Sequence, residues 1–173
     1  MKKLAIIFIA IFGMTFAFQS VNAQVNSSTV SAAAAGAKII APITLTNPTA
    51  LDFGNIIAGT GGTVIMTTGN ARSSTGGVTL QEAVDGQAAI FNVTGLEDAA
   101  FSITLPSADC VLDDVPETSS MTIAWATFNH SAGATPAITG ANFDFTVGAT
   151  LTVGSGQTAG IYSGEYEVTV TYE

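Results

Sequence analysis

Few side chains in this sequence could take part in acid–base, nucleophilic or zinc chemistry. His130 is the only histidine and Cys110 the only cysteine among the 173 residues. A Ser-His-Asp arrangement would have to use His130, yet the chain has no G-x-S-x-G motif and the surrounding stretch NHSAGATP has the composition of a loop. We therefore expect His130 to be a solvated loop residue. One histidine and one cysteine also exclude the usual zinc-ligand sets.

The single cysteine cannot form an intramolecular disulfide, so stability must come from packing and strand pairing. Cys110 follows Asp109 and precedes the apolar pair Val111-Leu112, with no cation nearby in the sequence. Such surroundings favour a half-buried, inert thiol over a reactive nucleophile or an intermolecular bridge.

The densest acidic stretch contains Asp109, Asp113, Asp114 and Glu117. Clustered carboxylates can bind calcium, a hard cation that takes several oxygen ligands. This stretch lacks the alternating Asp/Asn spacing and the internal glycine of a calcium loop, so a solvated acidic loop is favoured and calcium binding stays open. No spacing among the 13 acidic residues indicates a glycosidase pair. The sequence therefore predicts no catalytic residues, no cofactor and no metal.

Two glycine-rich stretches and the single tryptophan could suggest ligand binding. The stretches GTGGT (59–63) and GSGQTAG (154–160) lack the lysine of a phosphate loop, and strand patterns follow them, so we expect turns. Trp125 could serve as an exposed platform for a sugar. Because Trp125 continues the every-second-residue alternation of Met121 and Ile123, we expect it on the apolar face, in the core.

The elements that carry these residues have the pattern of short strands. From Ile39 onward, apolar residues alternate with polar ones in runs separated by glycine, asparagine and proline, with a turn expected at Asn47-Pro48. Eight or nine such runs without a helical stretch predict an all-β fold, an antiparallel immunoglobulin-like (Greek-key) β-sandwich. The runs are marked by Ile39, Ala41, Ile43 and Leu45; Leu51 and Phe53; Val64 and Met66; Val78 and Leu80; Ala89, Phe91 and Val93; Phe101, Ile103 and Leu105; Met121, Ile123 and Trp125; Phe143 to Val153; and Tyr162 to Tyr172.

The last run, GIYSGEYEVTVTYE, alternates most regularly. From Tyr162 onward its odd positions are polar, and its even positions form one face that ends at the penultimate residue. We expect this face to be a strand-pairing interface with Gly160 at its start. Its residues are Gly160, Tyr162, Gly164, Tyr166, Val168, Val170 and Tyr172.

The first residues predict export. Lys2 and Lys3 precede an apolar run from Leu4 to Phe18, and Val21-Asn22-Ala23 fits a signal-peptidase site. The expected organisation is a signal peptide (1–23), a flexible N-terminal arm rich in Ser and Ala (24–38), and a β-sandwich domain (39–173). No integral membrane segment is expected after cleavage.

The charge narrows the range of partners. The whole chain has a formal net charge of −9 at pH 7, and loss of Lys2 and Lys3 leaves the mature chain with a net charge near −11. Its remaining basic residues are Lys38 and Arg72. A phosphate backbone or an anionic membrane must be met by clustered cations, so nucleic-acid and anionic-lipid binding are not expected.

The sequence carries two resemblances to known families. The stretches KIIAPITLTNPTALDFGNIIAGTGGTV, RSSTGGVTL, FNVTGLEDAAFSITLP and VGATLTVGSGQTAGIYSGEYEVTVTYE closely resemble an exported bacterial family known as domain of unknown function 4402. The C-terminus is similar to that of chaperone–usher pilus subunits and spore-coat-U-like proteins, with Gly160 fourteenth from the end, Tyr172 penultimate and an alternating strand between them. This second resemblance implies an incomplete sandwich, completed by a strand from a periplasmic chaperone and later by the arm of the next subunit.

We therefore expect a structural, non-enzymatic, secreted subunit of a cell-surface fibre (pilus- or fimbria-like) or coat, which passes through the periplasm. Its partners would be other copies or related subunits, a periplasmic chaperone and an outer-membrane usher. The alternative is a self-contained secreted β-sandwich that binds a ligand such as a glycan. Whether the arm of residues 24–38 pairs in cis or in trans stays open.

Overall fold

The computed structural model describes residues 28–29, 32–81, 85–115 and 118–173. Ile39–Glu173 forms one compact unit, and the residues up to Lys38 belong to a separate one. The predicted signal peptide, and residues 24–27 and 30–31 of the predicted arm, lie outside the described residues. Among the described residues, no helix has the length and apolarity that a membrane span requires.

The described chain is all-β and antiparallel, as predicted. Every strand pairing is antiparallel, and the one helical element is a single 3₁₀ turn. The elements are β1 (Thr44–Thr49), β2 (Ile56–Ile57), β3 (Gly62–Met66), β4 (Arg72–Gly76), β5 (Thr79–Leu80), β6 (Ala89–Thr94), β7 (Phe101–Thr104), β8 (Cys110–Asp114), β9 (Ser120–Ile123), η1 (Trp125–Thr127), β10 (Asn129–His130), β11 (Phe143–Val153), β12 (Tyr162–Ser163) and β13 (Thr169–Tyr172).

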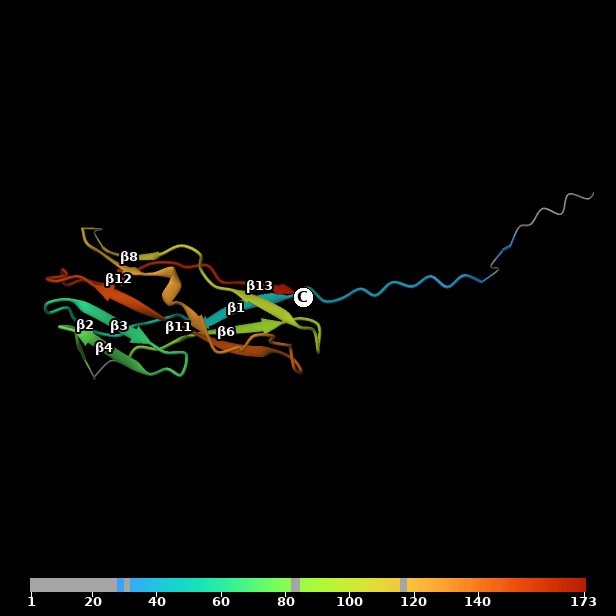
Figure 1. The fold of residues 1–173 in the computed structure, drawn as a ribbon, viewed down its shortest axis with the longest axis horizontal. Helices are drawn as coiled ribbons and strands as arrows, with labels where there is room; N and C mark the ends of the chain where they lie inside the picture. Colours follow the sequence, from blue (N-terminus) through green and yellow to red (C-terminus); the bar gives the residue numbers. More distant parts are fainter. Residues whose placement is uncertain (1–27, 30–31, 82–84, 116–117) are drawn as a thin grey trace, which may run out of the picture. The chain divides into compact units, whose positions relative to one another are not determined.

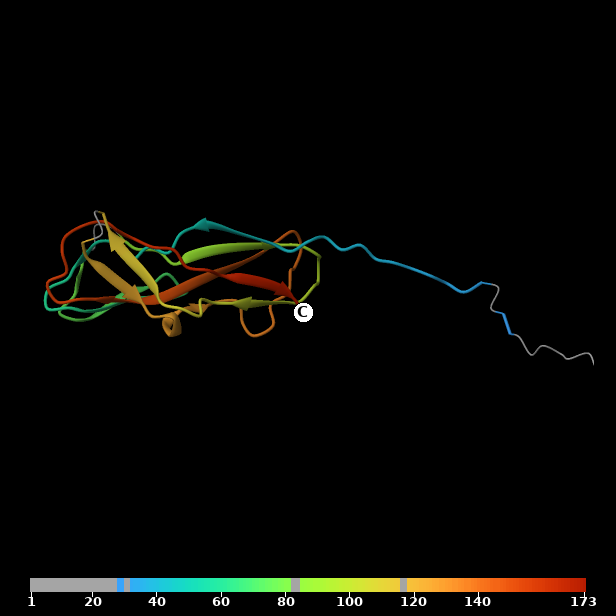
Figure 2. The same ribbon diagram turned by 90° about the horizontal axis from the view of Figure 1, so that it is seen from above.

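The long strand β11 organises the main sheet (Figure 1). Its first half pairs with β6 and its second half with β3, while β10 and β9 pair along its opposite edge. The main path runs β1-β6-β11-β9-β8-β12, with β3, β4 and β10 joined beside it. Figure 2 shows this sheet curling around the interior. Two small ladders, β13-β7 and β2-β5, complete the pairing.

Gly148 allows β11 to exchange one partner for the next. A Cβ at this position would lie 2.8 Å from the Thr67 carbonyl carbon and 2.9 Å from the Thr68 nitrogen. The backbone that leaves β3 therefore crosses directly over Gly148, where only a residue without a side chain fits. Pairing with β6 ends at Val147 and pairing with β3 begins at Ala149.

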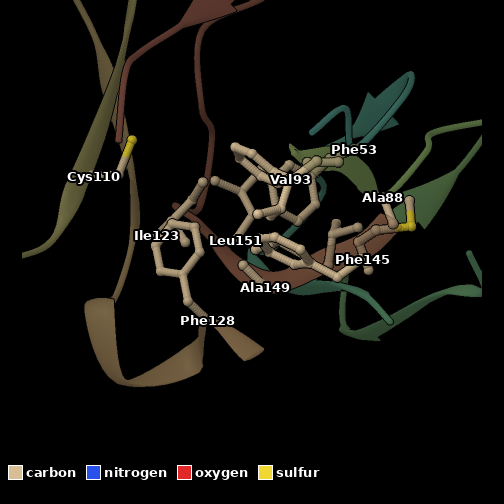
Figure 3. Packing of buried hydrophobic residues seen from close by; sticks show 14 of the residues in the cluster. Phe53, Ala88, Val93, Cys110, Ile123, Phe128, Phe145, Ala149 and Leu151 are labelled. Atoms are coloured by element: carbon tan, nitrogen blue, oxygen red, sulfur yellow. The ribbon is translucent and has the colours of Figure 1, made fainter. Parts of the chain in front are cut away.

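The interior is built from the alternating residues that the sequence pattern picks out. On β11, the odd positions from Phe145 to Val153 are buried, and Phe145 stacks on Phe91 with ring centroids 5.3 Å apart. Figure 3 shows these side chains packed together with Ile123 and Phe128, and Cys110 at one edge of the group. Each such side chain contributes about 1.5–3 kcal/mol when fully buried, which supports the fold without a disulfide.

The start of the domain differs from the sequence prediction. The strand begins at Thr44, and Ile39 is 98 % exposed in an extended segment that leads into it. Asn47-Pro48 lies inside β1, at a register shift between Thr46 and Thr49, and not in a turn. The shift is possible because β1 is an edge strand of the sheet, where a proline without an N–H and an irregular register are tolerated.

The prediction for Trp125 was wrong. Strand β9 ends at Ile123, so the alternation stops before Trp125, which opens the 3₁₀ turn and is 53 % exposed. The Trp125 N–H donates to Asp109 Oδ1 at 2.9 Å. This hydrogen bond fixes the turn and leaves the indole ring at the surface.

His130 also differs from its predicted solvated loop position. It lies in the short strand β10, half-buried, opposite Val147 of β11. Its Nδ1 accepts a hydrogen bond from the Ala132 N–H at 3.3 Å, and its ring meets the edge of Phe145. The turn residues that follow it gave the sequence a loop-like composition.

Candidate functional site

The C-terminal run forms two short strands, β12 and β13, separated by residues 164–168. Its alternation is confirmed, because the large side chains of the even face are half-buried and the odd positions are exposed. The half-buried residues are Tyr162, Tyr166, Val168, Val170 and Tyr172. Of these, Tyr166, Val168, Val170 and Tyr172 pack against the core without being fully enclosed.

One edge of this run is paired within the same chain. In β13, Thr169 lies opposite Thr104 and Tyr172 opposite Phe101 of β7. In β12, Tyr162 lies opposite Asp114 of β8. The neighbours on this edge are therefore β7 and β8, which pair with only six residues of the run.

Gly164 marks the point where the run leaves β8. A Cβ on Gly164 would collide with the carbonyl oxygen of Val111 and would lie 2.9 Å from Leu112 Cδ2. A glycine on an apolar face could have left space for an incoming side chain, but the backbone of β8 occupies that space. Gly164 therefore permits a close approach of two backbones of one chain.

The other end of the run is anchored in the turn of residues 154–160. The Tyr162 hydroxyl donates to the Thr158 carbonyl at 2.7 Å and accepts from Gln157 Nε2 at 3.0 Å. Gly160, the first residue of the predicted interface, lies against Asp114, to whose Cβ an added Cβ would be 3.4 Å away. These residues hold the turn, far along the run from Tyr172.

The other edge of β13 lies beside β1, and we call this junction the seam. Over these two strands, both of which are fully described, no ladder hydrogen bond joins β1 to β13. The strands run in opposite directions (Figures 1 and 2). Apolar side chains on both sides of the seam are half-buried and pack on the core: Ile43, Leu45, Val168 and Val170.

Tyr172 bridges one end of the seam. Its hydroxyl donates to the Ala41 carbonyl at 3.1 Å and accepts from the Leu96 N–H at 2.7 Å. Sequence reasoning identified Tyr172 but not Ala41, Leu96 or the β1 side of the seam. The alternation of Ile43 with Leu45 was the only available signal for that side.

Tyr166 fills the middle of the run. Its ring packs on Phe128, with centroids 4.9 Å apart, and meets Phe91 in an edge-on contact. Its buried hydroxyl has no hydrogen-bond partner among the described residues. Burial, with a smaller contribution from Cys110, raises the pKa of Tyr166 to about 12. Tyr166 is thus a neutral packing residue.

Cys110 is buried, and its thiol donates to the Glu165 carbonyl at 3.3 Å. Burial raises the pKa of this thiol, which disfavours the reactive thiolate. The predicted inert thiol is consistent with this environment, although the side chain is more fully enclosed than expected.

The acidic stretch does not form a single solvated loop. Asp114 is buried and accepts hydrogen bonds from the backbone of Thr118 and Ser119, whereas Asp109 binds the Trp125 N–H and Asp113 is exposed. Glu117 lies outside the described residues. Within the described ranges, no group of three His, Cys, Asp or Glu side chains is placed to hold a metal ion.

Two surface cavities accompany these features. One, of about 180 Å³, lies between residues 106–110 and 165–167, where β12 and β13 separate from their partners. The other, of about 350 Å³, is lined by Asn70, Arg72, Leu80, Asp85 and Gly86. Arg72 donates there to the carbonyls of Phe53 and Gln81, so its guanidinium stabilises neighbouring loops.

The comparisons with known proteins identify the family of this chain. A family model described as a domain of unknown function (DUF4402) matches residues 43–172. The match runs from the residue before β1 to the last residue of β13. An antiparallel all-β domain is thus the class of protein that the fold defines. The chain belongs to the DUF4402 family. Neither the curated proteins nor the solved structures gave a match.

Proposed function

We propose that this protein is a structural, non-enzymatic, secreted subunit that assembles into a cell-surface fibre or coat by β-strand addition. In this proposal the fold is an immunoglobulin-like, Greek-key sandwich that lacks one strand, and the missing strand comes from another chain. The observation that carries the proposal is the seam, where two neighbouring strands present unpaired edges and half-covered apolar side chains.

The seam has the features that strand addition requires. An unpaired edge offers a row of backbone N–H and C=O groups, and an added strand gains affinity from these and register from pockets for alternate side chains. Because β1 and β13 run in opposite directions, a strand inserted between them is parallel to one and antiparallel to the other. Its inward side chains would cover Leu45, Val168 and Val170, which this chain leaves half-buried.

The partners follow from the same chemistry. Another copy or a related subunit supplies the strand in the assembled form, and a periplasmic chaperone supplies one during transit to an outer-membrane usher. The exposed apolar Ile39 and Ile40, directly after the arm of residues 24–38, are compatible with a segment that pairs elsewhere. Final location is the cell surface or the extracellular medium, reached through the predicted signal peptide.

A specific observation favours the alternative, a secreted domain that binds a glycan. Trp125 is exposed, and its backbone is fixed by Asp109, which also lines the cavity of about 180 Å³. An exposed indole near a carboxylate that accepts hydrogen bonds from hydroxyl groups could bind a sugar ring. This alternative predicts a monomer, and the assembly experiment therefore separates the two functions.

Val170→Glu tests the seam. The change places a charge on the half-buried face of β13, where an added strand would enclose it at a cost of several kcal/mol unless the group is protonated. We expect the mature parent protein to associate and the variant to associate at least tenfold more weakly, as measured by light scattering across a dilution series.

Thr171→Glu is the matched control, because Thr171 is the next residue of β13 and is exposed. It should associate like the parent. Circular dichroism must show that both variants remain folded. A monomeric parent, or equal association of both variants, would remove the strand-addition proposal and favour the glycan-binding one.

A further inference from the structure

The hydroxyl of Tyr172 joins three segments at one end of the seam. It donates to Ala41, three residues before β1, and accepts from Leu96, two residues after β6. Both bonds have good lengths, 3.1 and 2.7 Å, so the hydroxyl uses its donor and one acceptor site. The segment that precedes β1 is therefore held at the C-terminal end of β13.

Gly95 provides the space for this junction. A Cβ at Gly95 would overlap the Tyr172 hydroxyl oxygen and would lie 3.1 Å from its Cζ and 3.0 Å from Ile138 Cδ1. Any other residue at this position would displace the Tyr172 ring or Ile138. The glycine is thus an independent sign that the chain is built around this placement of the hydroxyl.

The direction of the chain limits what the N-terminal arm can reach. From Ala41, β1 runs away from the C-terminal end of β13, in the opposite direction to β13 (Figure 1). Residues before Ala41 could enter the seam of their own chain only by reversing direction close to Ala41. That reversal would be a hairpin turn beside the Tyr172 junction.

The sequence at this point opposes such a turn. Pro42 fixes its own φ and confines Ala41 to extended conformations. Ile39 and Ile40 are β-branched, whereas tight hairpin turns need positive φ values that glycine or asparagine supply. The structure accordingly has no turn in residues 33–43.

The nearest glycine before this segment, Gly36, would fix the register of an arm that turned back on its own chain. With a two-residue turn at Gly36, residue 29 would lie opposite Thr44 and residue 24 opposite Thr49, so the first six residues of the arm would lie along β1. Of these residues, Val25 alone has a large apolar side chain. Self-closure through Gly36 would thus lay Val25 as the only large apolar side chain of the arm along β1, and the apolar side chains of the seam would stay poorly covered.

We propose that the Tyr172 hydroxyl, seated against Gly95, is a positioning group that holds the root of the arm and prevents the arm from closing its own seam. The arm is thereby kept for the seam of a second copy. This inference rests on the proposed strand addition, and it assigns the arm to trans pairing.

The test uses the full mature chain with four variants: Tyr172→Phe, Gly95→Ala, the double variant, and Tyr162→Phe. Tyr162→Phe is the matched control, because Tyr162 belongs to the same C-terminal run and its hydroxyl also has two hydrogen-bond partners, away from the seam. Amide hydrogen exchange of residues 24–43 is measured in dilute monomer, and association is measured by light scattering.

In the parent and in Tyr162→Phe, we expect unprotected arm amides and full association. In Tyr172→Phe and Gly95→Ala, we expect arm amides protected at least tenfold more strongly and association weakened at least tenfold. The Gly95→Ala change should alter arm protection and association less in the Tyr172→Phe background than in the parent. The reason is that loss of the hydroxyl removes the overlap with a new Cβ.

Arm amides that are already protected in the parent, or that stay unprotected in Tyr172→Phe, would overturn the inference. Exchange in the monomer reports on the arm whether or not copies associate. A failure of strand addition itself would appear as an equal association of Val170→Glu and Thr171→Glu, with these exchange results unaffected.

Discussion

At the scale of single residues, Asp114 shows how an acidic side chain can be structural in a chain that carries 13 acids. It lies at the end of β8, where the chain turns toward β9. Its carboxylate accepts from the N–H groups of Thr118 at 2.7 Å and Ser119 at 2.8 Å, and from the Thr118 hydroxyl at 3.0 Å. These bonds, the one from the Ser119 backbone foremost, lower the pKa of Asp114 despite the opposing effect of burial.

Asp114→Asn should lower the melting temperature at pH 7, because an amide offers one acceptor oxygen where the carboxylate meets three donors. A lowered folded-state pKa gives stabilisation that is present above the unfolded-state value near 3.8 and is lost as the pH falls through the folded-state pKa. Melts at pH 7 and below pH 3 should therefore show a difference from the parent that shrinks in acid. Asp113→Asn, at an exposed neighbour, is the control. A pH-independent deficit of Asp114→Asn would contradict the assigned role.

At the scale of elements, the C-terminal run matters because it is interrupted. A continuous strand from Tyr162 to Tyr172 would pair with one neighbour along its length, but β12 pairs with β8 and β13 with β7. Between these two pairings, the Tyr166 ring packs on Phe128, and Gly164 allows the run to lie close to the backbone of Val111. The break lets one run close two parts of the domain while its other edge stays unpaired at the seam.

Gly164→Val should destabilise the isolated domain by about 1–3 kcal/mol, the usual cost of overpacking, since the new side chain meets the backbone of Val111. Urea unfolding measures the change. Gly69→Ala is a suitable control, because an added Cβ there has only an ordinary contact at 3.8 Å. A variant that unfolds at the parent's midpoint but fails to associate would restore the view that Gly164 leaves room for a donor side chain.

The alternation in the sequence was sufficient to predict the class of fold and the inward face of most strands. It succeeded in β6, β11 and β13 because a half-buried strand buries every second residue. It failed at Pro48 and Trp125, whose positions depend on an unpaired edge and on a hydrogen bond from the Trp125 backbone N–H to Asp109. For the candidate site, the even face was predictable. The seam was not, because it depends on which strands become neighbours in three dimensions.

At the scale of the whole molecule, the arm belongs to a different compact unit from the domain. The family match begins at residue 43 and leaves out the arm of residues 24–38. The formal net charge is −9, and removal of the predicted signal peptide with Lys2 and Lys3 would bring it to about −11, so copies repel one another unless a specific contact overcomes the repulsion. Strand addition is a contact of this kind, because backbone hydrogen bonds do not depend on charge.

Deletion of residues 24–36 should abolish association and leave the melting temperature of the domain unchanged, because the compact unit begins at Ile39. Light scattering and thermal melts report the two effects. A synthetic peptide of residues 24–40, added to the parent, should compete for the seam and shorten the assemblies. A lower melting temperature for the deleted chain would instead indicate an arm that completes its own domain.

The position of β11 in the chain has a consequence for the order of folding. This strand is the common partner of β3, β6, β9 and β10, yet it begins only at Phe143. A nascent chain that ends before Phe143 has hairpins but no centre to join them, so the sheet forms only when nearly the whole polypeptide is present. Pairings over such sequence distances place folding on the order of milliseconds to seconds. In the proposed export route, a chain that stays open for so long would remain competent for translocation, and its sheet would close only after β11 has been translocated.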